Sequence, residues 1–349
     1  MQNEEKKHKR RVRYKGTHPK NYKEKYKEHQ PDVYSETVER VIQKGSTPAG
    51  MHISICVEEI LDFLQIRPGE VGLDATLGYG GHTLEMLKCM DSQGKLYATD
   101  VDSIELPKTE QRLRDLGYGE DIFKAVQTDF SNIDKIVLES GPLDFVLADL
   151  GVSSMQIDNP DRGFSFKYEG PLDLRLDPLK GQSATERLDR ISQPELEGML
   201  IENSDEPYAR EISTAMISEI KKGNRIETTT QLKQIIADAL AFIPKKDRDT
   251  VIKKSCQRSF QALRIDVNDE FEVLYEFLEK LPNSLASGGR VAILSFHSGE
   301  DRLVKKSFKN YFREGIYKEI SSSPIRPSQE ECNINPRARS TKFRWAIKA

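Results

Sequence analysis

A glycine-rich turn that follows a short apolar segment constrains this chain more than any other feature. Val71–Ala75 is predicted to form a strand, and Gly78, Gly80 and Gly81 lie in the turn directly after it. Because glycine has no Cβ atom, the backbone can bend sharply there and approach a ligand closely. Asp100 ends the second predicted strand, where a carboxylate can accept hydrogen bonds from ribose hydroxyls. The two features together predict a site for a cofactor that contains a nucleoside.

The order of residues in the turn favours one class of cofactor. In the dinucleotide fingerprint G-x-G-x-x-G, the third glycine packs the helix while a pyrophosphate lies at the helix N-terminus. Here Gly78 and Gly80 are followed by Gly81, His82 and Thr83, so the third glycine is missing, and the turn contains no Walker lysine. S-adenosylmethionine carries no phosphate and needs only a close backbone, a ribose acceptor and a slot for adenine. We therefore expect S-adenosylmethionine rather than NAD or ATP.

Strand-like and helix-like segments alternate along much of the chain from Val57 onward. This alternation predicts an α/β fold with a parallel sheet that is covered by helices on both faces. The predicted strands are Val71–Ala75, Leu96–Thr99, Ile122–Val126, Phe145–Leu150, Arg290–Ser295 and Lys342–Ile347. The predicted helices of this part are Val57–Leu64, Thr83–Met90, Pro107–Leu116 and Asn268–Leu281.

The alternation breaks near residue 160. Asp158–Gln182 is rich in Gly, Pro and Asp and is predicted to be a structured loop. Helical periodicity then dominates, in Pro194–Glu202, Tyr208–Lys222 and Thr230–Phe242, with almost no strand signal. We interpret this region as a helical insertion. The predicted organisation is a basic N-terminal arm (1–45), the first part of the α/β domain (46–158), a helical substrate-recognition insertion (159–252) and the second part of the α/β domain (253–349).

The distribution of charge points to an anionic partner. Residues 1–30 hold eleven Lys and Arg against four Asp and Glu, although the whole chain has a net charge of −3. Tyr14, Tyr22 and Tyr26 are interleaved with these basic residues, a pattern that suits phosphate contacts together with base stacking. A solvated tail is the alternative for such a charge run, and the sequence leaves both interpretations open.

Composition excludes several classes of protein. No apolar run approaches the roughly 18 residues that a membrane helix needs, and the charged N-terminus has no apolar signal segment. We therefore expect a cytoplasmic protein without membrane contact. The four cysteines, Cys56, Cys89, Cys256 and Cys332, are scattered without a C-x-x-C pair, so we expect neither a metal site nor a disulfide framework.

Candidate catalytic residues follow the fourth and fifth predicted strands. Asp149, Ser153 and Ser154 lie at the carboxyl end of the fourth strand, where ligands bind in open α/β sheets. A carboxylate and two hydroxyls there can accept hydrogen bonds from an exocyclic amine and later its proton. His297 follows the fifth strand and can position a base or relay a proton. Structural roles, a turn cap for Asp149 and a packed imidazole for His297, remain alternatives.

Long segments of the chain then carry a specific resemblance. They are DATLGYGGHT (74–83), DLGVSSMQIDNPDRGFSFKYEGPLDLRLDP (149–178), RSFQALRIDVNDE (258–270), SFHSGEDRLVK (295–305) and NPRARS (335–340). In the same order, they resemble the signature blocks of the ribosomal small-subunit (16S) RNA (cytosine-N4)-methyltransferases of the RsmH or MraW type. The resemblance runs from about His52 to the C-terminus.

The resemblance implies a Rossmann-like class I S-adenosylmethionine-dependent methyltransferase fold with an inserted helical domain. It also implies methyl transfer to the N4 amine of a cytidine in 16S rRNA near the decoding centre, with the rRNA or the small ribosomal subunit as partner. We expect a monomer or a homodimer. The residues that it assigns to the cofactor are Gly80, Gly81, His82, Asp100, Phe130 (beside the adenine), Asp149 and Gln156, and the glycine turn adds Gly78.

Further residues are candidates for contacts with RNA. A guanidinium fork matches the geometry of phosphate, although an arginine can instead form an ion pair within the protein. The candidate arginines are Arg162, Arg175, Arg264, Arg337 and Arg339. Phe164 and Phe166 can stack on bases or pack in the core. A methyl acceptor in DNA or protein, and a non-catalytic role in ribosome assembly, are the competing functions.

Overall fold

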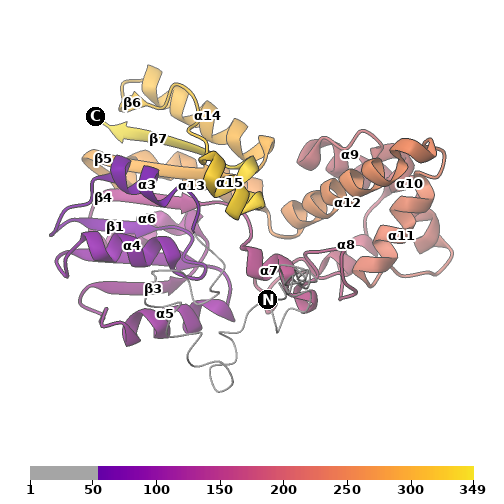
Figure 1. Cartoon of the computed structure of the whole chain (residues 1–349), viewed down its shortest axis with the longest axis horizontal. Coiled ribbons are helices and arrows are strands. Elements are labelled where there is room, and N and C mark those ends of the chain that lie inside the picture. Colours follow the sequence, from indigo (N-terminus) through magenta and orange to yellow (C-terminus); the bar gives the residue numbers. More distant parts are fainter. Residues whose placement is uncertain (1–53) are drawn as a thin grey trace, which may run out of the picture.

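The computed structural model describes residues 54–349, so the predicted basic arm (1–45) lies outside the described residues. Figure 1 shows two lobes: one is built on a β-sheet, and the other consists of the helices α8 to α12. We call them the sheet lobe and the helical lobe. The short helix α7 (Ser154–Asp158) lies between them (Figure 1).

The sheet lobe contains one seven-stranded sheet in the order β3-β2-β1-β4-β5-β7-β6. The first five strands of this order are parallel, whereas β7 pairs antiparallel with both β5 and β6. This arrangement confirms the predicted α/β fold class. The strands are β1 (Val71–Asp74), β2 (Lys95–Asp100), β3 (Phe123–Gln127), β4 (Leu143–Asp149), β5 (Leu285–Ser295), β6 (Tyr317–Ile320) and β7 (Lys342–Lys348).

Alternate residues of the strands bury against helices on opposite faces. In β4, Phe145 and Leu147 belong to the cluster formed with α3 (Val57–Leu64), α4 (Gly81–Cys89) and α5 (Glu105–Asp115). Val146 and Ala148 belong to the cluster formed with α6 (Ile133–Ser140), α13 (Glu270–Ser284) and α14 (Ser298–Arg313). Helices therefore cover both faces of the sheet and shield them from solvent, as is typical of parallel sheets.

The helical lobe has a hydrophobic core of its own. Leu196, Met216, Ile236 and Phe260 meet in it and are almost completely buried. The helices are α8 (Ala184–Leu188), α9 (Gln193–Ser204), α10 (Ala209–Lys221), α11 (Thr229–Ala239) and α12 (Lys245–Val267). The middle three correspond to the predicted helices. The predicted boundary after residue 252 falls inside α12, an uninterrupted helix of 23 residues whose buried side chains belong to this core.

Two other elements differ from the sequence expectation. The strand predicted at Arg290–Ser295 is longer in the structure, because β5 begins at Leu285 and shifts register between the pairs Leu143–Leu285 and Phe145–Arg290. The first part of β5 contains Gly288 and Gly289, so the hydrophobic pattern that identifies a strand begins only at Arg290. The predicted loop at 158–182 contains the short 3-10 helix η3 (Pro160–Arg162). The remaining short elements are η2 (Phe130–Asn132), α15 (Gln329–Ile334) and η4 (Pro336–Ser340).

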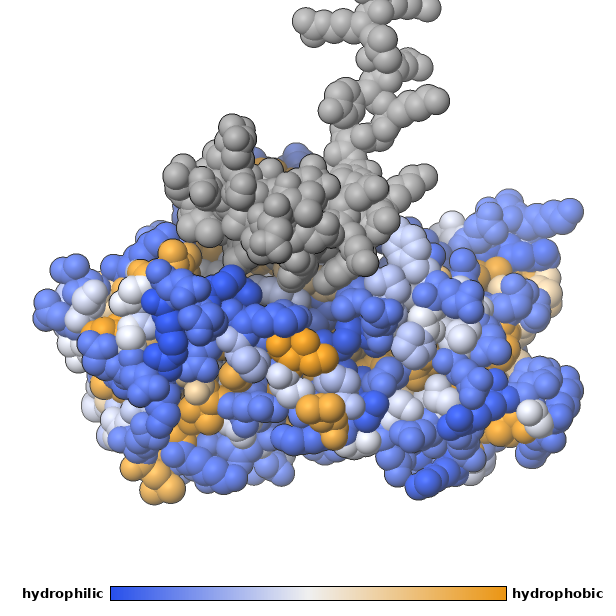
Figure 2. Space-filling view, turned by 90° about the horizontal axis from the view of Figure 1, so that it is seen from below, coloured by the Kyte–Doolittle hydropathy of each residue, from blue (hydrophilic) through white to orange (hydrophobic). Residues whose placement is uncertain are grey.

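None of the helices within residues 54–349 is both long and apolar enough to span a bilayer. On the face shown in Figure 2, hydrophilic residues dominate and hydrophobic ones are scattered.

Candidate active site

A cavity of about 1410 Å³ lies at the carboxyl ends of β1, β2 and β4 and extends to helix α12 of the helical lobe. Open α/β sheets bind their ligands at this edge. Typical small-molecule pockets measure about 300–1,000 Å³, so this cavity has room for more than one small ligand. Asp100, Asp149 and the glycine turn line its sheet-lobe side.

The turn after β1 depends on glycine at two positions. Gly78 and Gly80 adopt φ values of 49° and 74°, in the left-handed region that favours glycine. A Cβ atom on Gly80 would also lie 2.8 Å from Cγ2 of Thr109, a residue of α5. Thr109 Oγ1 donates a 2.7 Å hydrogen bond to the Gly78 carbonyl. Helix α5 therefore fixes the turn against the cavity.

Asp100 is held by the backbone on both sides. Its Oδ2 accepts a 2.7 Å hydrogen bond from the Gly78 N–H, and its Oδ1 accepts a 2.9 Å hydrogen bond from the Asp102 N–H. Burial raises the pKa of the carboxyl to about 6, although these two backbone hydrogen bonds act to lower it. The fixed carboxylate faces the cavity and fits the two hydroxyls of a ribose, so the residues present suit the nucleoside of S-adenosylmethionine.

Asp149 and His82 lie side by side in the cavity wall. The His82 Nε2–H donates a 2.9 Å hydrogen bond to the Ile55 carbonyl, and Nδ1 lies 3.6 Å from Oδ2 of Asp149. The other oxygen, Asp149 Oδ1, is enclosed and accepts no hydrogen bond from the described residues. Burial raises the pKa of Asp149 to about 6; His82 lowers it, and the carboxylates of Asp74 and Glu300 raise it. A buried acceptor without a partner is costly.

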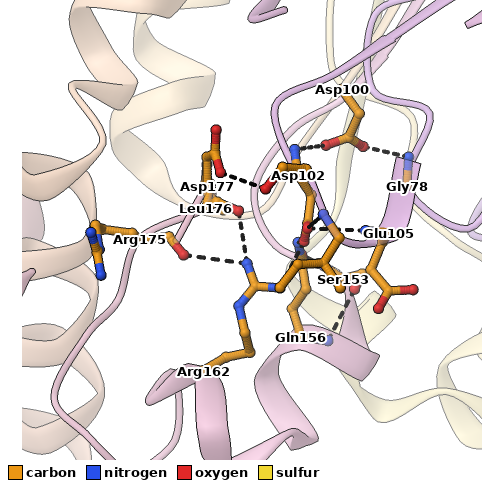
Figure 3. A network of polar contacts seen from close by, with 12 residues as sticks. Gly78, Asp100, Asp102, Glu105, Ser153, Gln156, Arg162, Arg175, Leu176 and Asp177 are labelled. Atoms are coloured by element: carbon orange, nitrogen blue, oxygen red, sulfur yellow. Dashed lines mark hydrogen bonds and ion pairs between the residues drawn. The ribbon is translucent and has the colours of Figure 1, made fainter. Parts of the chain in front are cut away.

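The most connected carboxylate of the site is one that the sequence analysis missed. Figure 3 shows Asp102 between Gln156 and Arg162, each of which donates a 2.8 Å hydrogen bond to Oδ2. The N–H groups of Ile104 and Glu105 donate to Oδ1. Asp102 thus joins the end of β2 to α7 and η3. Its position two residues after Asp100 was the available signal.

Two of the predicted RNA-contacting arginines are engaged inside the protein. The Arg162 side chain is only 8% exposed, pairs with Asp102 and also donates to the Leu176 and Arg175 carbonyls. This structural role replaces the phosphate contact expected for Arg162. Arg175 donates two hydrogen bonds, of 2.7 and 2.8 Å, to the carboxylate of Asp173.

The other three predicted arginines line the cavity. Arg264 binds Glu270 through two hydrogen bonds of 2.6 and 2.8 Å. Arg337 pairs with Asp158 at 2.7 Å and donates to the Ser154 carbonyl, so it connects η4 to α7. Arg339 is exposed. No ion pair or side-chain hydrogen bond joins Arg339 to another described residue, in contrast to Arg264 and Arg337.

The residues of α7 have local roles as well as a place in the cavity wall. Ser153 is the N-cap of α7: its Oγ accepts a hydrogen bond from the Gln156 N–H, and the Gln156 Oε1 accepts one from the Ser153 N–H. The Ser153 hydroxyl, expected to be catalytic, thus accepts the capping hydrogen bond. Ser154 is buried, and both serines and Gln156 line the cavity.

His297 caps α14. Its Nδ1 accepts a hydrogen bond from the Glu300 N–H at 3.4 Å, and its Nε2 lies 3.1 Å from Glu300 Oε1. Glu300 is buried; burial acts to raise its pKa, but the contacts with His297 and the Phe296 N–H lower the pKa overall. The imidazole is therefore held by the helix, and it reaches the cavity as part of its wall.

All three predicted aromatic residues line the cavity. Phe130 follows β3 and packs edge-on against Phe277 with ring centroids 5.2 Å apart. Phe164 is 8% exposed and also belongs to the core of the helical lobe, with the Arg162 guanidinium 5.7 Å from its ring centroid. Phe166 lines the cavity and is only partly buried.

Comparison with known proteins places the chain in a family. Residues 49–349 match the MraW methylase family. Ribosomal RNA small subunit methyltransferase H 2 of Alkaliphilus metalliredigens is 73% identical, with 100% of each chain covered. Ribosomal RNA small subunit methyltransferase H 1 of Lachnoclostridium phytofermentans is 70% identical over 100% of this chain and 95% of its own length. Ribosomal RNA small subunit methyltransferase H of Thioalkalivibrio sulfidiphilus is 38% identical over 86% of this chain and 98% of its own. The chain therefore belongs to the MraW methylase family, and it is an S-adenosylmethionine-dependent methyltransferase.

Proposed function

We propose that the protein transfers the methyl group of S-adenosylmethionine to the exocyclic N4 amine of a cytidine in small-subunit (16S) rRNA. The names of the close relatives support rRNA of the small subunit as the substrate. The observation that carries the proposal is Asp149 Oδ1, an enclosed carboxylate oxygen beside the glycine turn that lacks a donor among residues 54–349. An amine with two N–H bonds is the kind of donor that it fits.

The chemistry requires alignment and removal of a proton. The N4 lone pair of cytosine is delocalised into the ring, and the bound cofactor supplies an electrophilic methyl group. Asp149 Oδ1 accepts a hydrogen bond from N4, which orients the amine, and takes its proton once the new N–C bond has formed. His82 lies beside Oδ2, and this contact orients the carboxylate so that Oδ1 points toward the substrate. Alignment of reacting atoms can contribute roughly 7–11 kcal/mol of barrier reduction.

The site residues that sequence reasoning assigned have supporting roles in this proposal. Gly78, Gly80, Gly81 and Asp100 hold the nucleoside of the cofactor, and Phe130 flanks the adenine. His297 is a positioning residue, because both of its ring nitrogens face Glu300. The substrate domain comprises the whole helical lobe up to Val267, since α12 is continuous to that residue.

The test uses small ribosomal subunits from cells that lack the gene, together with labelled S-adenosylmethionine. The wild-type protein should form N4-methylcytidine, detected by mass spectrometry of the digested rRNA. Asp149→Asn should lose most of the turnover, because its amide cannot take the proton. Asp115→Asn removes an exposed carboxylate of α5 and should behave as wild type.

The alternatives give different results in the same experiment. Full turnover of Asp149→Asn would remove this carboxylate from the mechanism. Methyl transfer by the wild-type protein to DNA or protein, and not to rRNA, would overturn the proposed substrate. Failure to bind S-adenosylmethionine in calorimetry would favour a non-catalytic assembly factor.

A further inference from the structure

The helical-lobe wall of the cavity carries side chains that the proposed transfer reaction does not use. The cavity-lining residues of α12 recur at alternating intervals of three and one from Asp249 to Arg264. This spacing places them on one face of the helix. At about 1.5 Å per residue, the face extends for roughly 22 Å. The wall is therefore longer than one nucleoside.

Four polar or basic side chains of this wall are free for a ligand. Lys253 and Gln257 come from α12, Lys233 comes from α11, and Lys167 comes from the segment before α8; all four are exposed and line the cavity. No ion pair or side-chain hydrogen bond joins any of them to another described residue. Asp249 is the one acidic residue that α12 adds to this wall. The wall thus has a positive charge that faces open space.

An aromatic ring lies beside these basic groups. Phe166 is partly exposed to the cavity and packs edge-on against Phe260, with ring centroids 5.5 Å apart and an interplanar angle of 62°. Phe260 is 4% exposed and anchors the pair in the helical core. A fixed aromatic face next to lysines is the combination with which proteins bind single-stranded nucleic acid.

We propose that this wall is a second nucleotide site, which holds a nucleotide that neighbours the target cytidine in a single-stranded part of the RNA. Its base stacks on Phe166, and the amide of Gln257 contacts the edge of the base. Lys233 and Lys253 contact the adjoining phosphates. The inference rests on the proposed function, because it extends the same RNA from Asp149 to the helical lobe. The size of the cavity, about 1410 Å³, accommodates both sites.

The test combines binding and turnover with small subunits from cells that lack the gene. Phe166→Leu should weaken binding of the subunit by about 5- to 150-fold, the range that corresponds to one base–aromatic stack, and Phe166→Tyr should restore it. Lys233→Gln and Lys253→Gln should each weaken binding and reduce the slope of log affinity against log salt by about 0.7. Lys254→Gln, an exposed lysine of α12 outside the cavity lining, is the matched control. The affinity for S-adenosylmethionine, measured by calorimetry, should stay unchanged in all of them.

The outcomes separate this proposal from the one on which it rests. If the wild-type protein forms no N4-methylcytidine, the proposed function fails. If the wild-type protein does so, but the Lys253 and Lys233 variants bind subunits as Lys254→Gln does, the second site is refuted. A Phe166→Leu variant that also loses cofactor affinity is misfolded, and the two lysine variants then decide.

Discussion

At the scale of single residues, the two oxygens of Asp149 have different surroundings. Oδ2 faces His82 at 3.6 Å, whereas Oδ1 is enclosed and has no donor among the described residues. The sequence predicted the carboxylate at the end of β4, because a hydrophobic run followed by Asp149 is visible in it. It did not predict which oxygen is free, because this depends on His82, which is 67 positions away along the chain.

The raised pKa of Asp149 predicts the dependence of activity on pH. With a pKa of about 6, the carboxyl is protonated below that pH and cannot take the N4 proton. This pKa belongs to the free protein, so kcat/KM for the subunits should rise with pH through about 6 and level off above it. The measurement is a profile of kcat/KM between pH 5 and 8.5. A wild-type profile that is flat over this range would contradict the assignment.

The same shift predicts an effect on stability. The pKa of this carboxyl is higher in the folded than in the unfolded protein, so its charged form destabilises the fold above about pH 6. At a pH low enough to protonate the carboxyl in both states, this destabilisation is absent. Asp149→Asn should therefore raise the free energy of unfolding at pH 8, and this gain should shrink as the pH falls from about 6 toward 4. Urea denaturation of the variant and of Asp115→Asn measures it. A loss of stability at pH 8 would show that the charged form is favoured in the fold.

At the scale of elements, the Asp102 network holds three segments together. Asp102 Oδ2 accepts hydrogen bonds of 2.8 Å from the side chains of Gln156 in α7 and Arg162 in η3 (Figure 3). The Ser103 hydroxyl donates a 2.7 Å hydrogen bond to Asp177, which adds the loop before α8. The cofactor side of the cavity is thereby linked to the chain that enters the helical lobe.

Removal of one partner from this network should be costly. The side chains of Arg162 and Asp102 are 8% and 1% exposed, and loss of one member of a buried ion pair leaves the other charge uncompensated. Arg162→Ala should lower the free energy of unfolding by about 3–5 kcal/mol, as measured by urea denaturation. Arg339→Ala, an exposed arginine of the cavity rim, should change it by less than about 0.5 kcal/mol. Equal stability of both variants would remove the structural role of Arg162.

Most of the sheet lobe was predictable from the sequence, because its strands are short apolar runs between helical patterns. The end of the helical region was not, since the cavity-lining face of α12 mixes polar and apolar residues and gives a weak periodic signal at Lys253 and Gln257. The second nucleotide site was not predicted either, because polar residues such as Lys253 and Gln257 are also typical of a solvent-exposed helix face. Arg162 was predicted to contact RNA because the guanidinium of an arginine in a loop is suited to bind phosphate. Its actual partner, Asp102, is 60 positions away along the chain and lies beside it only in the folded protein.

At the scale of the whole molecule, the lysines of the cavity wall lie on a different lobe from the carboxylates at the edge of the sheet. Asp100, Asp149 and Glu300 lie on the sheet-lobe side of the cavity, whereas Lys233 and Lys253 lie on the helical-lobe side. The predicted basic arm is a further positive region of the sequence, and it lies outside the described residues. The match to the MraW methylase family begins at residue 49, yet the relative from Alkaliphilus metalliredigens aligns over all 349 residues.

The arm should act through charge on RNA affinity and leave the chemistry unchanged. Replacing Lys9, Arg10, Arg11 and Arg13 by glutamine removes four positive charges from the full-length chain. If each of them neutralises one phosphate of single-stranded RNA, the slope of log affinity against log salt should fall by about 3. Filter binding of small subunits between 50 and 200 mM salt, about the range in which such contacts are lost, measures the slope. The affinity for S-adenosylmethionine and kcat at saturating subunits should stay at the wild-type value, because the charges that line the cavity are intact. An unchanged slope would show that the arm does not contact the RNA. A fall in kcat would show that the arm acts at the active site instead.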